Sequence, residues 1–155
     1  MNILLDSNVL LRLTDPTSAS HGIALTAVAS LRAQGDVLYI VPQCVYEFWV
    51  VAGRPIAKNG LGLSVAECIR ELAHVEMSFP LLDDKPMLYT EWKTLVMTFG
   101  CQGKVAHDAR YVAAMRTYGL SHLLTFNVGD FARYPGLVAL DPNTIAASAP
   151  QANTP

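Results

Sequence analysis

The sequence is poor in charged residues and has no excess of basic ones. Only 15% of the 155 residues are charged, and 11 Lys and Arg stand against 13 Asp and Glu, which gives a formal net charge of −2. A protein that binds nucleic acid through its overall charge is usually basic. If this chain handles nucleic acid, we expect it to use local Arg and Lys side chains or bound cations.

The sequence also lacks the cysteine patterns of a secreted or zinc-binding protein. Its three cysteines, Cys44, Cys68 and Cys101, are odd in number and far apart, so there is no disulfide framework and no CxxC zinc spacing. This usage is typical of the reducing cytoplasm. No uncharged apolar run approaches the ~18 residues that suggest a membrane span. Asp6 interrupts the first apolar stretch, which argues against a secretory signal. We therefore expect a cytoplasmic protein that does not enter a membrane.

What the sequence does have is a high apolar content, 52%, arranged in short strand-like runs that alternate with longer helical segments. The pattern predicts strands at 2–5, 37–41, 122–125 and 138–140, and helices at 9–13, 21–34, 42–52, 64–75, 86–99 and 104–118. Such alternation predicts an α/β fold, a three-layer α/β/α sandwich around a mostly parallel sheet. We expect one domain over residues 1–145 and a frayed tail of small and polar residues over 146–155.

Polar side chains follow two of the predicted strands. Asp6 comes directly after the first strand, and Asn127 and Asp130 follow the strand that ends at Thr125. Ligands of open parallel sheets bind outside the carboxyl ends of the strands, so these residues should reach the same edge. Asp6 can equally serve as a helix cap.

Two further acids stand on predicted helices. Glu47 lies in a helix with almost no polar face, which we expect to be buried all round, and a lone Glu is rarely buried without a partner. The alternative is that Glu47 points into solvent from the edge of the helix. Asp108 lies in the first turns of a late helix, where the helix dipole also favours an anion on a solvated face.

If these four acids converge, their like charges repel and cannot all stay ionised without compensation. A divalent cation is the usual solution, and oxygen ligands suit Mg²⁺ or Mn²⁺ rather than zinc. Such an ion can activate water and stabilise a displacement at phosphorus.

Four segments of the sequence resemble PIN-domain nucleases, and most closely the VapC-like toxins of bacterial type II toxin–antitoxin pairs. They are Asp6-Ser7-Asn8-Val9-Leu10-Leu11 after the first strand, Glu47 in its apolar helix, His107-Asp108-Ala109-Arg110, and Thr125-Phe126-Asn127-Val128-Gly129-Asp130-Phe131. Their order, their spacing and the chain length agree with the family over residues 1–142.

The resemblance implies a metal-dependent endoribonuclease with an α/β/α fold, a small antitoxin partner and commonly a homodimer. Asp6, Glu47 and Asp108 carry over as metal-binding catalytic acids, and Asp130 or Asn127 as the fourth. Asn8 and Thr125 would hold carboxylates or water through hydrogen bonds. Lys104 and Arg110, with Arg12 and Arg133, are candidates for phosphate contacts, or else ordinary surface charge.

Three other functions compete with this one. A PIN-like domain without catalysis could bind RNA or protein only. A receiver-like signalling domain also gathers acids and Mg²⁺, but it needs an acidic pair at the first strand and a late Lys, which this sequence does not offer. His74, His107-Asp108 and Asp130 have the order of an HD phosphohydrolase, whose fold is wholly helical.

Overall fold

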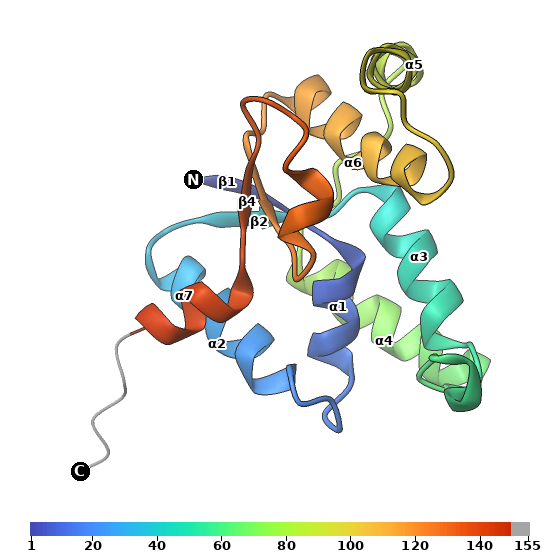
Figure 1. Ribbon diagram of the computed structural model, residues 1–155. Helices are drawn as coiled ribbons and strands as arrows, with labels where there is room; N and C mark the ends of the chain where they lie inside the picture. Colours follow the sequence, from blue (N-terminus) through green and yellow to red (C-terminus); the bar gives the residue numbers. More distant parts are fainter. Residues whose placement is uncertain (150–155) are drawn as a thin grey trace.

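A computed structural model describes residues 1–149 of the chain, and within them the centre is a sheet of four parallel strands (Figure 1). The strands are β1 (Asn2–Leu5), β2 (Val37–Tyr39), β3 (His122–Leu124) and β4 (Val138–Leu140), in the order β2-β1-β3-β4. In register, Leu4 pairs with Tyr39 and Leu123, so β1 is flanked by a strand on each side. Ile3, Leu4 and Leu5 are all buried, so both faces of β1 are covered, which accounts for its uninterrupted apolar run.

Helices cover both faces of this sheet. Within residues 1–149 they are α1 (Ser7–Thr14), α2 (His21–Ala33), α3 (Pro42–Ala52), α4 (Val65–Ser78), α5 (Met87–Phe99), α6 (Lys104–Tyr118) and α7 (Pro142–Ser148), with short 3₁₀ turns η1 (Ile56–Lys58) and η2 (Val128–Phe131). In Figure 1, α2 and α7 lie on one side of the sheet, α5 and α6 on the other, and α3 at the end toward which β1 runs. This arrangement confirms the predicted PIN-like three-layer α/β/α fold and is incompatible with a wholly helical HD fold.

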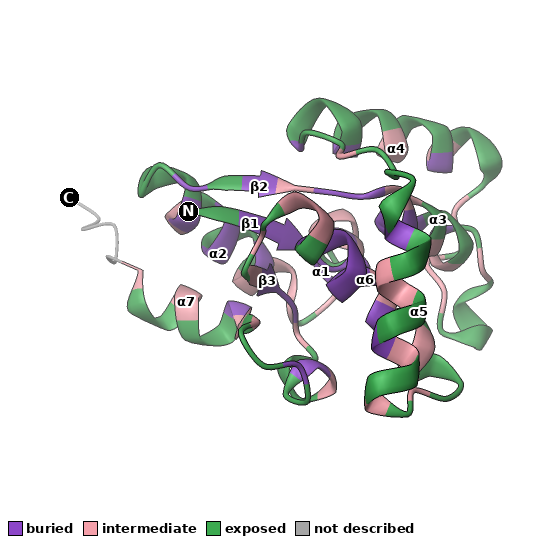
Figure 2. Ribbon diagram, turned by 90° about the horizontal axis from the view of Figure 1, so that it is seen from above, coloured by how far each residue is buried: buried purple, intermediate pink, exposed green. Residues whose placement is uncertain are grey.

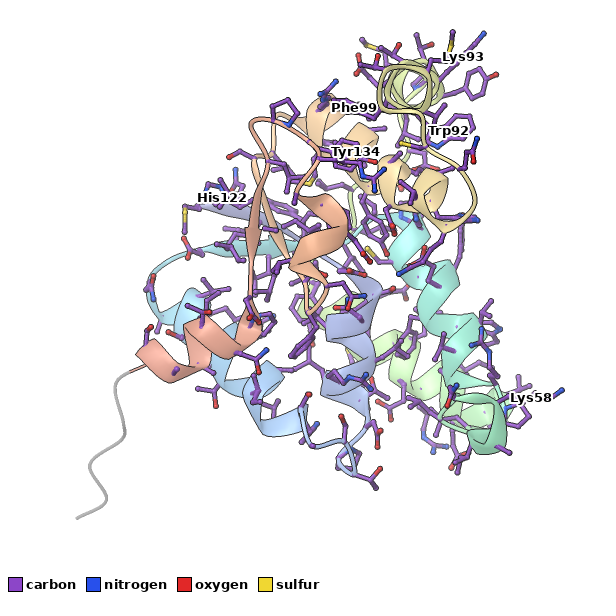
Figure 3. The ribbon with its side chains drawn as sticks, in the orientation of Figure 1. Lys58, Trp92, Lys93, Phe99, His122 and Tyr134 are labelled. Atoms are coloured by element: carbon purple, nitrogen blue, oxygen red, sulfur yellow. The ribbon has the colours of Figure 1, made fainter. Side chains whose placement is uncertain are left out.

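The core sits where the strands meet the inner faces of these helices. Ile3, Leu4 and Leu5 of β1 are fully buried, as are both leucines at the end of β3 (Figure 2). Aromatic rings extend the core away from the sheet: Phe99 and Tyr134 pack edge to face with ring centroids 5.1 Å apart and join α5 to the segment after η2 (Figure 3). The sheet is therefore a rigid base for whatever stands at its edge.

Two sequence predictions need correction. Helix α3 is not buried all round: Phe48 is buried, but Tyr46, Trp49 and Val50 are exposed. The final helix α7 was not predicted, although Asp141 accepts a hydrogen bond from the backbone N–H of Asn143 as its N-terminal cap. Residues 146–148, assigned to the frayed tail, belong to this helix, and the rest of that tail, 150–155, lies outside the described residues.

No helix in the described part of the chain has the length and apolar character needed to cross a membrane.

The loop of residues 53–63 folds back onto the end of α3. The backbone N–H groups of Leu61 and Leu63 donate to the carbonyls of Val51 and Ala52, at 3.1 and 3.0 Å. The bond from Leu63 pairs a carbonyl that the end of a helix commonly leaves unpaired, whereas the Val51 carbonyl also accepts from the backbone N–H of Arg54 at 3.2 Å. Gly60 makes the return possible because its backbone lies against Arg54: a Cβ at Gly60 would stand 2.0 Å from the Arg54 carbonyl oxygen.

We expect Gly60→Ala to destabilise the protein by about 1–3 kcal/mol, the usual cost of forcing atoms into a packed region. Urea unfolding measures this loss. Gly22→Ala in α2 is the matched control, because a Cβ there meets no atom within 4 Å. Its stability should stay level or rise slightly. Equal stability of the Gly60→Ala protein and the native protein would show that the loop relaxes without cost.

Candidate functional site

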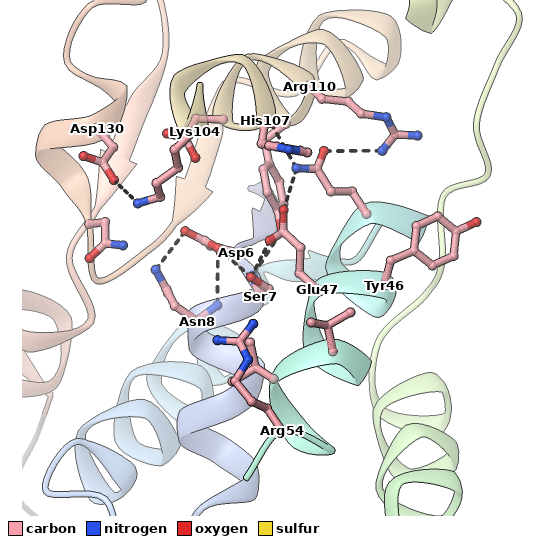
Figure 4. A pocket seen from close by; sticks show the side chains of 16 residues that line it. Asp6, Ser7, Asn8, Tyr46, Glu47, Arg54, Lys104, His107, Arg110 and Asp130 are labelled. Carbon is pink, nitrogen blue, oxygen red and sulfur yellow. Dashed lines mark hydrogen bonds and ion pairs between the residues drawn. The ribbon is translucent and has the colours of Figure 1, made fainter. Parts of the chain in front are cut away.

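A pocket of about 620 Å³ opens at the carboxyl end of the sheet, and all four acids singled out in the sequence line it (Figure 4). They come from separate parts of the chain: the turn between β1 and α1, helix α3, helix α6 and the turn η2. The four acids are Asp6, Glu47, Asp108 and Asp130. Residues up to 124 positions apart in the sequence (130 − 6) thus meet at one place.

Asp6 is the most buried of these acids, with 7% of its surface exposed. It caps α1, and its two carboxylate oxygens accept bonds from the N–H of Asn8 at 3.3 Å and the side-chain amide of Asn8 at 2.8 Å. The Thr125 hydroxyl donates to it at 2.6 Å. Burial raises the pKa of Asp6; the bond from Thr125 opposes that rise, and the nearby charge of Glu47 adds to it. The Asp6 side chain therefore caps α1, as predicted, and also lines the pocket.

Asn8 and Thr125 join α1 to the segment after β3. The Asn8 side-chain amide donates to the Thr125 hydroxyl at 3.1 Å, and its carbonyl accepts from the backbone N–H of Phe126 at 3.2 Å. Asn127 donates its backbone N–H to the same hydroxyl at 3.0 Å, and it also lines the pocket. This network fixes the direction in which the Asp6 carboxylate faces.

Glu47 is held by neutral donors on three helices. The Ser7 hydroxyl donates to one of its oxygens at 2.6 Å and the Tyr111 hydroxyl to the same oxygen at 2.8 Å. The Gln43 amide donates to the other oxygen at 2.8 Å. Burial raises the pKa of Tyr111 well above its usual value, so its hydroxyl keeps its proton and remains a donor. Glu47 is therefore neither unpartnered nor free in solvent.

Sequence reasoning did not assign roles to Ser7, Gln43 and Tyr111, although each left a signal. Ser7 is next to Asp6, Gln43 precedes Glu47 by one helical turn, and Tyr111 follows Asp108 by three residues on the same helix face. Neutral polar residues at such positions are common on any helix. Only the three-dimensional arrangement shows that they meet at one carboxylate.

Lys104 stands among the acids on the other side of the pocket. Its ammonium donates to Asp130 at 3.0 Å. That bond raises the pKa of Lys104, and the charges of Asp130, Asp108 and Asp6 raise it further. Asp108 is half-buried, and burial raises its pKa; Lys104 opposes this rise, whereas the other acids add to it.

The remaining candidate cations divide into two groups. Arg110 lines the pocket, but its guanidinium is directed away from Asp6 and Asp130 and donates to Gln43 at 3.3 Å (Figure 4). Arg110 also pairs with Asp84. Arg12 and Arg133 are exposed, and neither is among the residues of the described range 1–149 that line the pocket. Arg54 does line it and was not predicted.

The histidines of the HD alternative do not come together. His107 lines the pocket, and its backbone carbonyl accepts from Gln43 at 3.0 Å. His74 lies on α4, 3.5 Å from Glu71, and lines a different cavity.

The donor chemistry of the pocket suits a hard divalent cation, because its acids offer carboxylate oxygens only. Within residues 1–149, no three Asp, Glu, His or Cys side chains stand close enough together to hold an ion jointly. Mg²⁺ usually binds one or two carboxylates directly and keeps several water molecules. The residues present therefore fit Mg²⁺ or Mn²⁺ bound partly through water.

The fold is shared with solved toxin–antitoxin proteins. VapBC2 from Rickettsia felis, bound to a DNA fragment from its promoter, matches with a TM-score of 0.67 at 15% identity, over 91% of this chain and 98% of the other. VapBC-1 from nontypeable Haemophilus influenzae matches with a TM-score of 0.66 at 17% identity, over 92% and 98%. Mycobacterium tuberculosis VapC20, a toxin that cleaves the sarcin–ricin loop, matches with a TM-score of 0.54 at 17% identity, over 97% and 98%. Neither a protein-family model nor a curated protein matches the sequence. At these identities the likeness shows the fold, that of VapC-like PIN domains.

We expect Asp108→Asn to raise the melting temperature of the protein in EDTA at neutral pH. The pKa of Asp108 is raised in the folded protein above its usual value near 3.8, so the ionised form opposes folding. The gain should be complete above the raised pKa and should disappear as the pH falls to the usual value. Calorimetry at several pH values measures it, with the exposed Glu76→Gln as control. A gain that is independent of pH would contradict this electrostatic origin.

Proposed function

We propose that this protein is a metal-dependent endoribonuclease that acts as the toxin of a toxin–antitoxin pair. The observation that carries the proposal is the gathering of four carboxylates from distant segments into one pocket of a VapC-like fold. Acids in such an arrangement are suited to hydrolysis of a phosphodiester, whose charge a cation must offset. RNA is favoured as substrate because the similar VapC20 is a toxin that cleaves the sarcin–ricin loop.

In this proposal Asp6, Glu47 and Asp108 hold Mg²⁺ or Mn²⁺ partly through bound water, because no three such side chains within residues 1–149 stand close enough to contact one ion together, and Asp130 or Asn127 completes the site. The bound ion supplies a Lewis acid that lowers the pKa of water and stabilises negative charge on the phosphate. The chain itself orients the acids: Thr125 and Asn8 fix Asp6, while Ser7, Gln43 and Tyr111 keep Glu47 in place. Such outer partners restrict the ligands to productive geometry before substrate arrives.

Besides its ion pair with Asp130, Lys104 contacts the RNA backbone in this proposal. Its ammonium faces Asp130 with most of the side chain exposed, so it is able to turn toward a phosphate that enters the pocket. The surrounding acids raise its pKa, so the amine stays charged at neutral pH. Lys104 thereby supplies the local positive charge that a chain of net charge −2 needs to hold RNA.

Several features favour a protein partner. The exposed apolar side chains Trp49 and Val50 of α3 and Val65 of α4 line a hollow between these helices. Exposed apolar surface of this kind is typical of interaction sites. The similar structures from Rickettsia and Haemophilus are toxin–antitoxin complexes. We therefore propose an antitoxin as partner and a homodimer as the assembled toxin.

The free cysteines suit a cytoplasmic location.

Purified protein should cleave RNA in the presence of Mg²⁺ or Mn²⁺ and lose this activity in EDTA. Asp6→Asn should abolish cleavage while leaving the circular dichroism spectrum unchanged, because Asn keeps the helix cap but removes the charged ligand. Equal cleavage by this variant would point to a contaminating nuclease. Intact RNA with every metal tested would instead favour the alternative of a silent RNA- or protein-binding module.

Tyr111→Phe should lower metal affinity or the rate of cleavage about 10–100-fold, the usual effect of removing a partner of a metal ligand. The variant keeps the ring, which packs edge to face on Phe131, and loses only the hydroxyl that donates to Glu47. Tyr118→Phe is the control, since its hydroxyl donates to the backbone of Asp83 outside the pocket. Metal titration by calorimetry and initial rates measure both variants. Matching losses in the two would argue against a specific role for Tyr111.

A further inference from the structure

A second cavity adjoins the acidic pocket and shares one residue with it. This cavity has a volume of about 420 Å³ and lies between the start of α5 and helix α6. Arg110 lines both spaces. Arg110 therefore marks the border between the acidic pocket and the second cavity.

The wall of this cavity carries two neighbouring aromatic rings. Tyr89 is 64% exposed, an unusual state for so large a ring, and its centroid lies 6.1 Å from that of Trp92 at an interplanar angle of 31°. The indole N–H of Trp92 donates to the backbone carbonyl of Ala106 at 2.7 Å, so this ring is fixed on the side of α6 (Figure 3). Tyr89 thus faces solvent, whereas Trp92 is half-buried and packs against the core.

Positive charge lies beside these rings. The Arg110 guanidinium is anchored by Gln43 on one side and Asp84 on the other. Lys85 also lines the cavity, and its ammonium lies 3.8 Å from the centre of the Tyr118 ring. Aromatic rings combined with fixed cations are the elements that bind unpaired nucleic-acid bases and their phosphates.

We propose that this cavity is a subsite for an unpaired nucleobase of the RNA whose phosphate enters the acidic pocket. The base stacks on Tyr89 and Trp92, and Arg110 contacts the backbone between the two spaces. The inference rests on the proposed function and adds to it the place where an unpaired base beside the cleaved bond is held, the cavity between the start of α5 and helix α6. Stacking tolerates every base, so the subsite selects unpaired strands rather than a sequence.

The test measures binding of a fluorescein-labelled, single-stranded 2′-O-methyl RNA by fluorescence anisotropy in the presence of Ca²⁺, an oxygen-preferring cation that offsets the charge of the acids. Tyr89→Ala should weaken binding about five-fold or more, the factor that corresponds to the lower end of the ~1–3 kcal/mol per stacked base. Tyr89→Phe, which keeps the ring, should bind within about two-fold of the native protein. Unchanged binding by Tyr89→Ala, or no binding by the native protein, would overturn the proposal.

A matched control separates this subsite from an interface between two copies of the chain. Met97 is 73% exposed on the same helix and does not line the cavity. Met97→Ala should leave RNA binding unchanged. If Tyr89→Ala and Met97→Ala both convert a dimer to a monomer in sedimentation experiments and leave RNA binding intact, the face is an interface between copies and the proposal is wrong.

A second readout reports on the position of the base directly. The chain has two tryptophans, so in a Trp49→Phe variant the emission comes from Trp92 alone. Single-stranded RNA should quench this emission, and duplex RNA should quench it much less. Equal quenching by both forms would contradict stacking of an unpaired base.

These measurements are independent of cleavage. If Tyr89 is needed for binding but no metal supports cleavage, the subsite stands and the nuclease function fails. If RNA is cleaved and Tyr89→Ala binds as the native protein does, the nuclease function stands and the subsite fails.

Discussion

Repulsion between carboxylates is the constraint on which the rest of the site depends. The fold brings four acids to one edge of the sheet, and it partly removes Asp6 and Asp108 from water. Both burial and like charge raise the pKa of these two acids. Their ionised forms therefore destabilise the folded state. Such a site is stable only because hydrogen bonds hold the acids and because a packed core supplies the free energy that the pocket costs.

The repulsion between the acids is reduced by different groups on the two sides of the pocket. Asp6 and Glu47 accept hydrogen bonds from neutral groups on buried elements, which cannot leave without disturbing the core. Asp108 and Asp130 face Lys104 instead, whose side chain is long and exposed. One half is thus fixed, and the other half is able to rearrange. In the proposed function this asymmetry would let Asp6 and Glu47 set the position of an ion while the other acids adjust to it.

The strands and helices could be predicted from sequence because their patterns are local, whereas Glu47, Asp108 and Asp130 were singled out as a set through the resemblance to PIN-domain nucleases. Uninterrupted apolar runs specify buried parallel strands, and Asp6 follows such a run directly. The exposure of α3 could not be predicted, since a helix that is apolar on every face does not show which face meets the core. Tyr111 could not be assigned either, because its hydroxyl meets Glu47 from 64 positions away in the sequence. Helix α7 was missed because small residues have no amphipathic pattern, although Asp141-Pro142 was a start signal.

The acidic balance of the chain limits how it can hold RNA. Non-specific affinity for nucleic acid comes mainly from neutralised phosphates, and a net charge of −2 provides little of it. If the chain holds RNA as proposed, binding would therefore come from short-range contacts: a cation among the acids, Lys104 and Arg110 at its border, and aromatic rings beyond. Contacts of this kind act only when the strand fits the pocket and the cavity together. A weakly charged surface attracts most RNA strands only weakly. In the proposed function, a strongly charged pocket on such a surface thus favours selection of RNA by shape.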